Sequence, residues 1–502
     1  MGLLQVHSFV AGQWAAPAGD VVPLHNAFTG ALIGHASAGA PDVGAMYDHA
    51  LATGGPSLRA MTFHDRARML KALAQYLSAR KNELYELSYL TGATKSDSWI
   101  DIDGGIGTTF VFASKGRREM PDAHVYLDGD VEMLSRHGSF VGQHVCTPLQ
   151  GVAVHINAFN FPVWGMLEKL APTLLAGMPA IVKPATVTGY LTEAAFRMII
   201  ESGLLPDGAV QLVSGRLGPL LDMLGPQDAV SFTGSAVTGV MLRGTPNLLE
   251  RSVRFSAEQD SLNATILGPD VMVGDPEFDL FIKEAAGEIT AKAGQKCTAV
   301  RRILVPEALR QPVAEALRAA LDDVAIGDPR LKEVGMGALA SGGQKQDVLA
   351  KCEMFKGEAR CIIGGEAPRL TGEDLAGGAF VAPTIFDCAD PDGATHLHEQ
   401  EAFGPVACLM AYRKLGHAAV LANRGGGALV TSVVTRDREV AHSLVAASAC
   451  HHGRLYFNNR DSMAEATGHG APLPHMVHGG PGRAGGSEEL GGVRAVKHYM
   501  QR

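Results

Sequence analysis

The chain has no excess of basic residues, because 43 Lys and Arg stand against 52 Asp and Glu, for a formal net charge of -9. This balance gives no support to nucleic-acid binding through a basic face. No run of about 18 apolar residues occurs, so no membrane span is predicted. The opening residues, MGLLQVHSFV, lack the basic start, apolar core and cleavage site of a secretory signal. We therefore expect a cytoplasmic protein.

Motifs that would define other classes are also missing. The seven cysteines are scattered and odd in number, which is typical of cytosolic thiols and not of a disulfide framework. No GxSxG elbow of a serine hydrolase occurs, and the usual GxGxxG of a dinucleotide site is absent from residues 151–258. The groups His396-His398-Glu399-Glu401 and His451-His452 fit no helical pair of metal ligands. We expect ordinary packing or surface histidines there, and no metal.

A length of 502 residues with 46% hydrophobic residues predicts two or three structural units. Leucines at helical spacing predict an amphipathic helix from His64 to Leu90. Between residues 126 and 147 the apolar pattern changes to period two around the turn at 136–139, which indicates a protruding hairpin. Such a hairpin offers an edge to another subunit, so we expect a homodimer as the minimal closed assembly.

From residue 151 short apolar runs alternate with helical stretches. The runs start at residues 151, 180, 209, 229 and 252, and this βαβ series predicts a parallel sheet. Ligands of such sheets bind beyond the carboxyl ends of the strands. The residues expected at that edge are Asn157, Asn160, Lys183, Pro184, Ser214, Gly215, Thr233, Gly234, Ser235 and Glu258.

These residue types suit a nucleotide. The helix that follows Gly234 and Ser235 offers free N–H groups to a pyrophosphate, and Lys183 can reach a ribose hydroxyl or a phosphate. The alternative is that the glycines of GSAVTG, from Gly234 to Gly239, only let a helix pack closely on the sheet.

Residues 262–470 repeat the α/β pattern and predict a second domain. The fold class is therefore α/β, with two parallel-sheet domains and a small β element for oligomerisation. We assign 1–125 and 148–258 to dinucleotide binding, 259–470 to catalysis, and 126–147 with 480–502 to oligomerisation strands. The Gly-rich run 479–486 is expected to be a sharply bent loop, and 493–500 an edge strand.

Cys297 stands in the stretch EITAKAGQKCTAVR, between a predicted helix and a predicted strand. Nucleophiles are often placed on such loops. A buried structural thiol is the alternative for a lone cysteine.

Six motifs in order resemble the aldehyde dehydrogenase superfamily along essentially the full chain. They are Asn160-Phe161-Pro162, the segment 169–185, FTGS at 232–235, Glu258, GQKC at 294–297 and EAFGP at 401–405. The Gly-rich end is similar to the branch that oxidises CoA-linked semialdehydes in aerobic benzoate and phenylacetate breakdown. The resemblance differs after Glu258, where Gln259-Asp260 replaces the family's Leu-Gly.

The resemblance implies a role for each site residue. Cys297 is the nucleophile, which requires a lowered thiol pKa or a nearby base, Glu258 activates water, and Asn160 stabilises the alkoxide. Residues expected to hold the cofactor are Lys183, Thr186, Gly215, Phe232, Gly234, Ser235, Glu401 and Phe403. Lys169 either carries protons beside Glu258 or is structural.

The cofactor and the reaction class follow from two further positions. Thr186 stands where NAD-preferring members often carry an acidic residue, so NADP is the expected cofactor and NAD is the alternative. The other interpretation of Thr186 is that it only caps a helix that begins near Gly189. The substrate is expected to be a small-molecule aldehyde, either free or linked to CoA. Two other hypotheses remain, a CoA-acylating dehydrogenase and a non-catalytic binding protein on the same fold.

Overall fold

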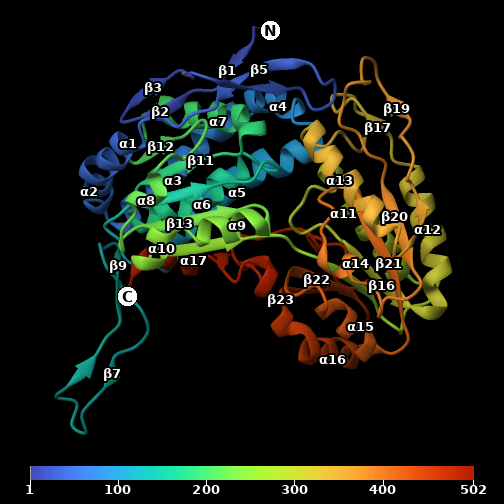
Figure 1. Cartoon of the computed structure of the whole chain (residues 1–502). Coiled ribbons are helices and arrows are strands. Elements are labelled where there is room, and N and C mark those ends of the chain that lie inside the picture. Colours follow the sequence, from blue (N-terminus) through green and yellow to red (C-terminus); the bar gives the residue numbers. More distant parts are fainter. Residues whose placement is uncertain (1, 18) are drawn as a thin grey trace.

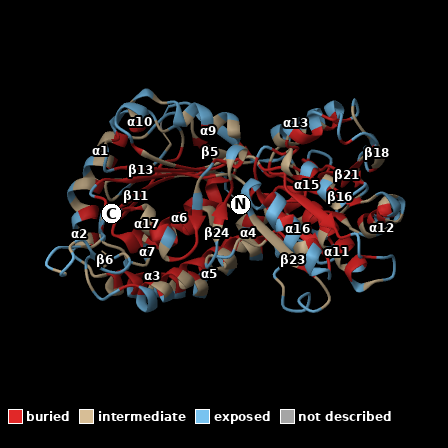
Figure 2. Cartoon of the chain, turned by 90° about the horizontal axis from the view of Figure 1, so that it is seen from below, coloured by how far each residue is buried: buried red, intermediate tan, exposed pale blue. Residues whose placement is uncertain are grey.

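Two lobes make up the molecule, each built around one seven-stranded sheet (Figure 1, Figure 2). The structure is a computed structural model that describes residues 2–17 and 19–502. Both sheets are parallel over most of their width, which confirms the predicted fold class. None of the helices in these residues is long and apolar enough to cross a membrane.

The first sheet has the order β14-β13-β10-β11-β12-β2-β3. All five predicted strands between 151 and 258 are present in it. The strand bounds are β2 (Ser8–Val10), β3 (Gln13–Ala15), β10 (Ala153–Ile156), β11 (Ala180–Lys183), β12 (Val210–Leu212), β13 (Ala229–Thr233) and β14 (Arg254–Glu258). β10 to β14 run parallel, and the antiparallel strands β2 and β3 form one edge.

Helices cover both faces of this sheet. Because successive side chains of a strand point to opposite faces, Ala153 and Val154 of β10 belong to two different apolar cores. One core contains α2 (Gly55–Arg59), α3 (Phe63–Arg80), α5 (Lys95–Glu119), α6 (Trp164–Ala176) and α7 (Gly189–Glu201). The other contains α1 (Val43–His49), α8 (Leu220–Met223) and α10 (Pro246–Glu250).

The second sheet has the order β18-β20-β21-β16-β15-β22-β23. Its bounds are β15 (Ala264–Leu267), β16 (Arg302–Pro306), β18 (Arg360–Ile363), β20 (Thr384–Cys388), β21 (Val406–Tyr412), β22 (Ala428–Val434) and β23 (His452–Asn458). One face packs on α11 (Pro276–Thr290) and α12 (Arg310–Asp322). The other packs on α13 (Gly342–Phe355), α14 (His396–Glu399), α15 (Leu415–Asn423) and α16 (Arg438–Ser448).

Small sheets complete the molecule. β1 (Leu4–Gln5), β5 (Leu32–Ser37) and β4 (Val21–His25) pair in that order, β17 (Ile326–Gly327) pairs with β19 (Leu370–Thr371), and β24 (Val477–Gly479) pairs with β25 (Glu488–Leu490). β24 and β25 follow the second sheet in the chain, but β25 lies against β14 of the first. The last part of the chain therefore returns to the first lobe.

The predicted hairpin is present and projects away from both lobes (Figure 1). It contains β6 (Tyr126–Leu127), β7 (Glu132–Met133), β8 (Val141–Gly142) and β9 (Val145–Pro148), with β7 paired to β8 and β6 to β9. The final strand β26 (Met500–Gln501) pairs with β9.

Two predictions of local structure were wrong. Residues 493–500 are not an edge strand, because α17 (Val493–His498) fills most of this stretch and only β26 is extended. Ala495 and Val496 of α17 are buried, and the helix contacts α6. The single helix predicted from His64 to Leu90 is two helices, α3 and α4 (Asn82–Tyr89), separated by a turn at Lys81.

Candidate active site

The loop that carries Cys297 is sharply bent. It follows α11 and precedes β16, and three successive residues, Lys292, Ala293 and Gly294, have positive φ angles of 52°, 50° and 68°. A Cβ atom on Gly294 would lie 2.1 Å from the carbonyl oxygen of Gly404, so only glycine fits. Lys292 anchors the bend, since its Nζ donates to Thr91 at 2.8 Å. Residues held in rare backbone conformations cluster at functional sites.

Glu258 and His478 meet Cys297 from two other segments. Glu258 is the last residue of β14, and His478 is the central residue of β24. His478 Nε2 lies 3.1 Å from Glu258 Oε1 and 3.8 Å from Cys297 Sγ. The structure therefore brings the predicted nucleophile and the predicted base together, and adds a histidine between them.

Burial and mutual contacts determine the ionisation of Cys297 and Glu258. Burial and the Glu258 carboxylate raise the pKa of the Cys297 thiol. The sequence predicted either a lowered thiol pKa or a nearby base. The lowered pKa is wrong, and the nearby base is present as Glu258. Burial opposes the charge on Glu258, but His478 and Lys169 outweigh it and lower the pKa of Glu258 to about 2. The resting site therefore holds a thiol beside a carboxylate.

Asn160 contacts the same loop. Its Nδ2 donates to the carbonyl oxygen of Gln295 at 2.9 Å, and the side chain is buried. Within the described residues, the backbone N–H of Cys297 has no protein acceptor. An amide nitrogen and a free N–H beside the sulfur are the donor types that an alkoxide requires.

A second buried cluster lies behind Glu258. Lys169 Nζ is 2.7 Å from Thr233 Oγ1, 3.3 Å from Glu168 and 3.4 Å from Glu489. Burial disfavours the ammonium, but the carboxylates of Glu489 and Glu168 outweigh it and raise the pKa of Lys169. Burial also disfavours the charged form of Glu168, and it raises the pKa of this carboxyl to about 7. Lys169 thus lies within a chain of titratable groups that reaches Glu258.

The carboxyl edge of the first sheet carries the predicted cofactor residues. Lys183 ends β11, and its Nζ donates to the carbonyl oxygen of Pro184 at 3.0 Å. Burial lowers the pKa of Lys183. Asn157, one residue past β10, is buried, and neither atom of its side-chain amide has a partner in the described part of the chain. Unsatisfied polar groups at this edge fit a polar ligand such as a nucleotide.

The turn between β13 and α9 (Ala236–Arg243) holds Gly234 and Ser235. Ser235 is the N-cap residue of α9 and accepts from the Thr238 N–H, while Asp260 accepts from the Ala236 N–H at 2.9 Å. The Asp260 carboxylate therefore occupies part of the helix terminus. Phe232 lies in the apolar core beneath this turn, where its ring supports Gly234.

Two other predicted residues lie at this edge. Gly215 has a φ of 112°, and a Cβ atom there would lie 2.2 Å from the carbonyl oxygen of Gly39, which explains the glycine. Thr186 begins a short 3-10 turn, Thr186–Thr188, before α7. The N-cap position of α7 belongs to Thr188, so the alternative that Thr186 only caps this helix was wrong.

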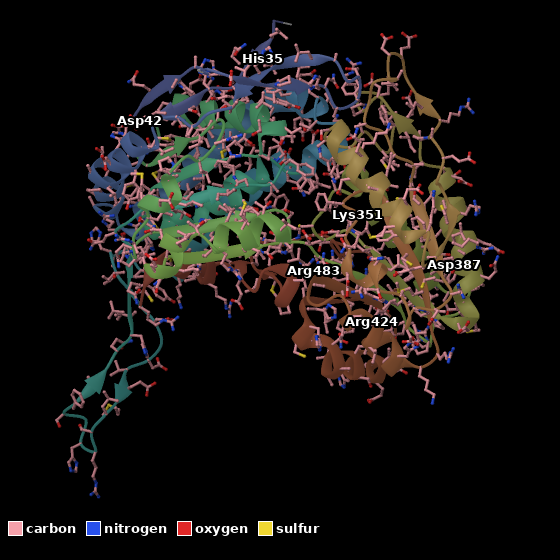
Figure 3. All side chains as sticks on the ribbon, in the orientation of Figure 1. His35, Asp42, Lys351, Asp387, Arg424 and Arg483 are labelled. Carbon is pink, nitrogen blue, oxygen red and sulfur yellow. The ribbon has the colours of Figure 1, made fainter. Side chains whose placement is uncertain are left out.

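The EAFGP segment is fixed by one arginine. Arg301 Nε lies 3.1 Å from Glu401 Oε1, and Arg301 also donates to the carbonyl oxygens of Gly404 and Gly294. The ring of Phe403 lies 5.8 Å from that of Phe159, edge to face. Arg483, labelled in Figure 3, bonds Glu399 of the second lobe and Asp260 near α9.

The histidines considered as metal ligands have other partners. His398 contacts Arg302 at 3.2 Å and the carbonyl oxygen of Pro391 at 3.0 Å, and His452 contacts Thr431 and Asn423. His398 and His452 are therefore packing histidines, as the sequence predicted. The histidine that the sequence interpretation missed is His478, which lies 181 positions after Cys297 in the chain. Its place directly before the Gly-rich run was the only available signal.

The chain belongs to the aldehyde dehydrogenase family, whose model matches residues 14–502. It is 40% identical over 480 residues to the 3,4-dehydroadipyl-CoA semialdehyde dehydrogenase of Aromatoleum evansii, covering 95% of this chain and 93% of the relative. A putative aldehyde dehydrogenase from Burkholderia cenocepacia has a TM-score of 0.86 at 25% identity, covering 99% and 96%. A point mutant of Staphylococcus aureus betaine aldehyde dehydrogenase, solved with NAD+, has a TM-score of 0.84 at 22% identity, covering 99% and 96%. The predicted family is confirmed.

Proposed function

We propose that this protein oxidises a CoA-linked semialdehyde to the carboxylic acid, through a thioester on Cys297 and with NADP as the preferred hydride acceptor. The observation that carries the proposal is the convergence of Cys297 and Glu258, whose ligand atoms lie within 4.8 Å of one another. Asn160 holds the loop of the same cysteine, so all three predicted catalytic residues meet at one place.

The first half of the reaction needs a base and an alkoxide site. Glu258 takes the thiol proton of Cys297, and the sulfur adds to the aldehyde carbon while the carbonyl electrons move to oxygen. The side-chain amide of Asn160 and the N–H of Cys297 donate to this oxygen. When the carbonyl forms again, the hydrogen on carbon leaves as hydride, and a thioester remains on Cys297.

A bound nicotinamide dinucleotide supplies the acceptor for that hydride. On the protein side, Lys183 and Glu401 would hold the two riboses, Ser235 would bind the pyrophosphate, and Phe403 would contact the nicotinamide ring. The unsatisfied amide of Asn157 and the weakly bonded ammonium of Lys183 support a polar ligand at this edge.

Hydrolysis of the thioester completes the cycle. After releasing the thiol proton to solvent, Glu258 accepts a proton from water, whose oxygen attacks the thioester carbonyl. The Cys297 thiolate then leaves and takes this proton from Glu258. A CoA-acylating enzyme would instead use CoA to resolve the thioester. The buried carboxylate beside the sulfur favours water.

The substrate class is supported by the relative that is 40% identical, whose name specifies a CoA-linked semialdehyde. Reduction of NADP and NAD should be measured against a panel of free and CoA-linked aldehydes of equal chain length. We expect kcat/KM to be highest for a CoA-linked semialdehyde. Equal rates with the matched free aldehydes would contradict this substrate class, and no reduction with any aldehyde would contradict the reaction.

A homodimer is part of the proposal. The hairpin exposes several large apolar side chains, with exposed fractions from 52% to 64% at Leu127, Val131, Met133, Leu134 and Phe140. A monomer would leave this apolar surface and the edges of β7 and β8 in water. Sedimentation equilibrium at micromolar concentration should give twice the chain mass of 52.7 kDa.

A further inference from the structure

Three donor atoms of different chemistry converge where Cys297 lies. A carboxylate oxygen of Glu258, the sulfur of Cys297 and a ring nitrogen of His478 are all within 4.8 Å of one another. They come from the end of β14, the loop before β16 and the centre of β24, so three separate segments of the fold hold them in place. Glu258 and His478 are buried, and Cys297 is half-buried.

We propose that Glu258, Cys297 and His478 form a Zn²⁺ site, and that a bound Zn²⁺ holds the enzyme in an inactive state. Thiolate, imidazole and carboxylate are the three ligand types that Zn²⁺ takes in proteins. Three protein ligands leave the fourth tetrahedral position to water, as in zinc sites that are open to exchange.

The spacing of the donor atoms fits this ion. Tetrahedral Zn²⁺ with ordinary bond lengths places sulfur about 3.5 Å from nitrogen, and nitrogen about 3.3 Å from oxygen. The observed separations are 3.8 Å from Cys297 Sγ to His478 Nε2 and 3.1 Å from His478 Nε2 to Glu258 Oε1. These two separations differ from the tetrahedral values by about 0.3 Å or less, and the sulfur lies within 4.8 Å of the Glu258 oxygen.

The charges also balance. A Cys297 thiolate and a Glu258 carboxylate carry two negative charges, which neutralise one Zn²⁺ in a buried place where a net charge would be costly. Glu258 also belongs to a group of carboxylates with Glu168 and Glu489, but the ammonium of Lys169 already lies between the latter two. Of the two groups, only the one with Cys297 and His478 combines the ligand types that Zn²⁺ prefers.

Binding of Zn²⁺ would exclude the aldehyde reaction. The ion replaces the proton of the Cys297 thiol, which is released to solvent, and the sulfur lone pair that would attack the aldehyde forms the Zn–S bond instead. The carboxylate of Glu258 is occupied at the same time. Metal and aldehyde therefore compete for the same two side chains, and removal of the metal restores both.

The test uses Co²⁺ as a spectroscopic substitute for Zn²⁺. The full chain with Cys450→Ser is the background, because Cys450 is exposed beside His451 and offers an unrelated metal-binding pair. After treatment with a chelator, titration with Co²⁺ should give one ion per chain, a thiolate-to-cobalt charge-transfer band and the intense visible bands of a tetrahedral site. Addition of Zn²⁺ should abolish these bands.

Variants identify the ligands. Cys297→Ser should abolish the charge-transfer band, and Glu258→Gln and His478→Gln should each weaken metal binding at least about tenfold. His475→Gln is the matched control, because His475 lies in the same segment but is exposed and outside the cluster. Melting temperatures without metal identify variants that fail to fold. A six-coordinate spectrum without the thiolate band, or His478→Gln binding as tightly as the control, would overturn the proposal.

A second measurement follows the nucleophile directly. One equivalent of Zn²⁺ should slow alkylation of Cys297 by iodoacetamide at least about tenfold in the control, and a chelator should reverse this effect. The effect should be absent in His478→Gln, and equal protection in that variant would count against the site. Neither measurement needs an aldehyde, so each tests the metal site independently of the proposed oxidation.

Discussion

The Nε atom of Arg301 lies 3.1 Å from Oε1 of Glu401, and both side chains are buried at the junction between the cysteine loop and the EAFGP segment. The same guanidinium donates to the carbonyl oxygens of Gly294 and Gly404. Glu401 also accepts from the Ser261 N–H at 3.1 Å. One ion pair therefore connects the Cys297 loop to the residue proposed to hold a ribose of the cofactor.

This relationship predicts a pH dependence of cofactor binding. Burial raises the pKa of Glu401 to about 7, although Arg301 opposes the rise. A carboxylate accepts hydrogen bonds from ribose hydroxyls better than a carboxylic acid does, so affinity should be highest above pH 7 and fall as the pH drops below it. Calorimetric titration of cofactor from pH 8 to pH 5.5 should show a Kd that rises by up to about tenfold per pH unit.

The control for this experiment is Glu399→Gln, which removes an exposed carboxylate two residues earlier and should retain the wild-type pH profile. Glu401→Gln should bind more weakly and lose the pH dependence. If its Kd still varies with pH as in the wild type, the titrating group is a different one.

Cys297→Ala should remove aldehyde-dependent cofactor reduction, by at least about a thousandfold, because no other group can form the covalent intermediate. Cofactor affinity should change little, since the thiol is proposed to act only on the aldehyde. Cys450→Ser, at an exposed cysteine, is the matched control and should keep full activity. Substantial turnover by Cys297→Ala would show that the nucleophile is misassigned.

Glu258→Gln should slow formation of the thioester, because the amide cannot take the thiol proton of Cys297, and should also slow its hydrolysis, because the amide cannot accept a proton from water. A thioester that forms should therefore persist on Cys297, while steady-state turnover falls by about a hundredfold or more. Mass spectrometry of the quenched enzyme should find the acyl group on the peptide that contains Cys297. Absence of this adduct, together with normal turnover, would mean that another group activates water.

The buried carboxyl of Asp101 predicts a pH effect on stability. Its Oδ1 accepts from the N–H groups of Val163 and Trp164, and burial raises its pKa to about 7. The folded state then keeps a proton that the unfolded state releases above about pH 4. The contribution of Asp101 to the free energy of unfolding should therefore fall as the pH rises from 4 to 7, by up to about 4 kcal/mol, and stay constant above pH 7.

Asp101→Asn keeps an acceptor oxygen and cannot ionise, so its stability relative to the wild type should increase over this pH range. Thermal melts at several pH values measure the difference. Asp130→Asn, in the exposed hairpin, is the control and should show no such trend. A constant difference between Asp101→Asn and the wild type would refute the predicted titration.

The sequence predicted the parts of this fold that depend on local pattern. β10 and β11 are buried on both faces and are short apolar runs, so the parallel sheet that contains them was predicted from the βαβ alternation. The juxtaposition of Cys297, Glu258 and Asn160 came from the resemblance to a family. His478 reaches the same place through β24, whose position depends on contacts with the first lobe that no local pattern encodes. The helix α17 was missed for a similar reason, because the surface it packs against is formed by α6, more than 300 residues earlier.

Cofactor choice is the last prediction, and it depends on the surroundings of Lys183. The pKa of Lys183 is lowered by burial, and no carboxylate forms an ion pair with this ammonium among the described residues. A lysine without such a partner can pair with the 2′-phosphate of NADP, whereas a carboxylate at position 186 would repel that phosphate and accept from the 2′-hydroxyl of NAD. The wild type should therefore have a higher kcat/KM with NADP than with NAD. Thr186→Glu should reverse or erase the preference, and Thr186→Gln, of similar size but neutral, should keep it. Each tenfold change in the ratio corresponds to about 1.4 kcal/mol of differential binding. Equal kcat/KM values in the wild type, or the same ratio in Thr186→Glu and Thr186→Gln, would show that this position does not select the cofactor.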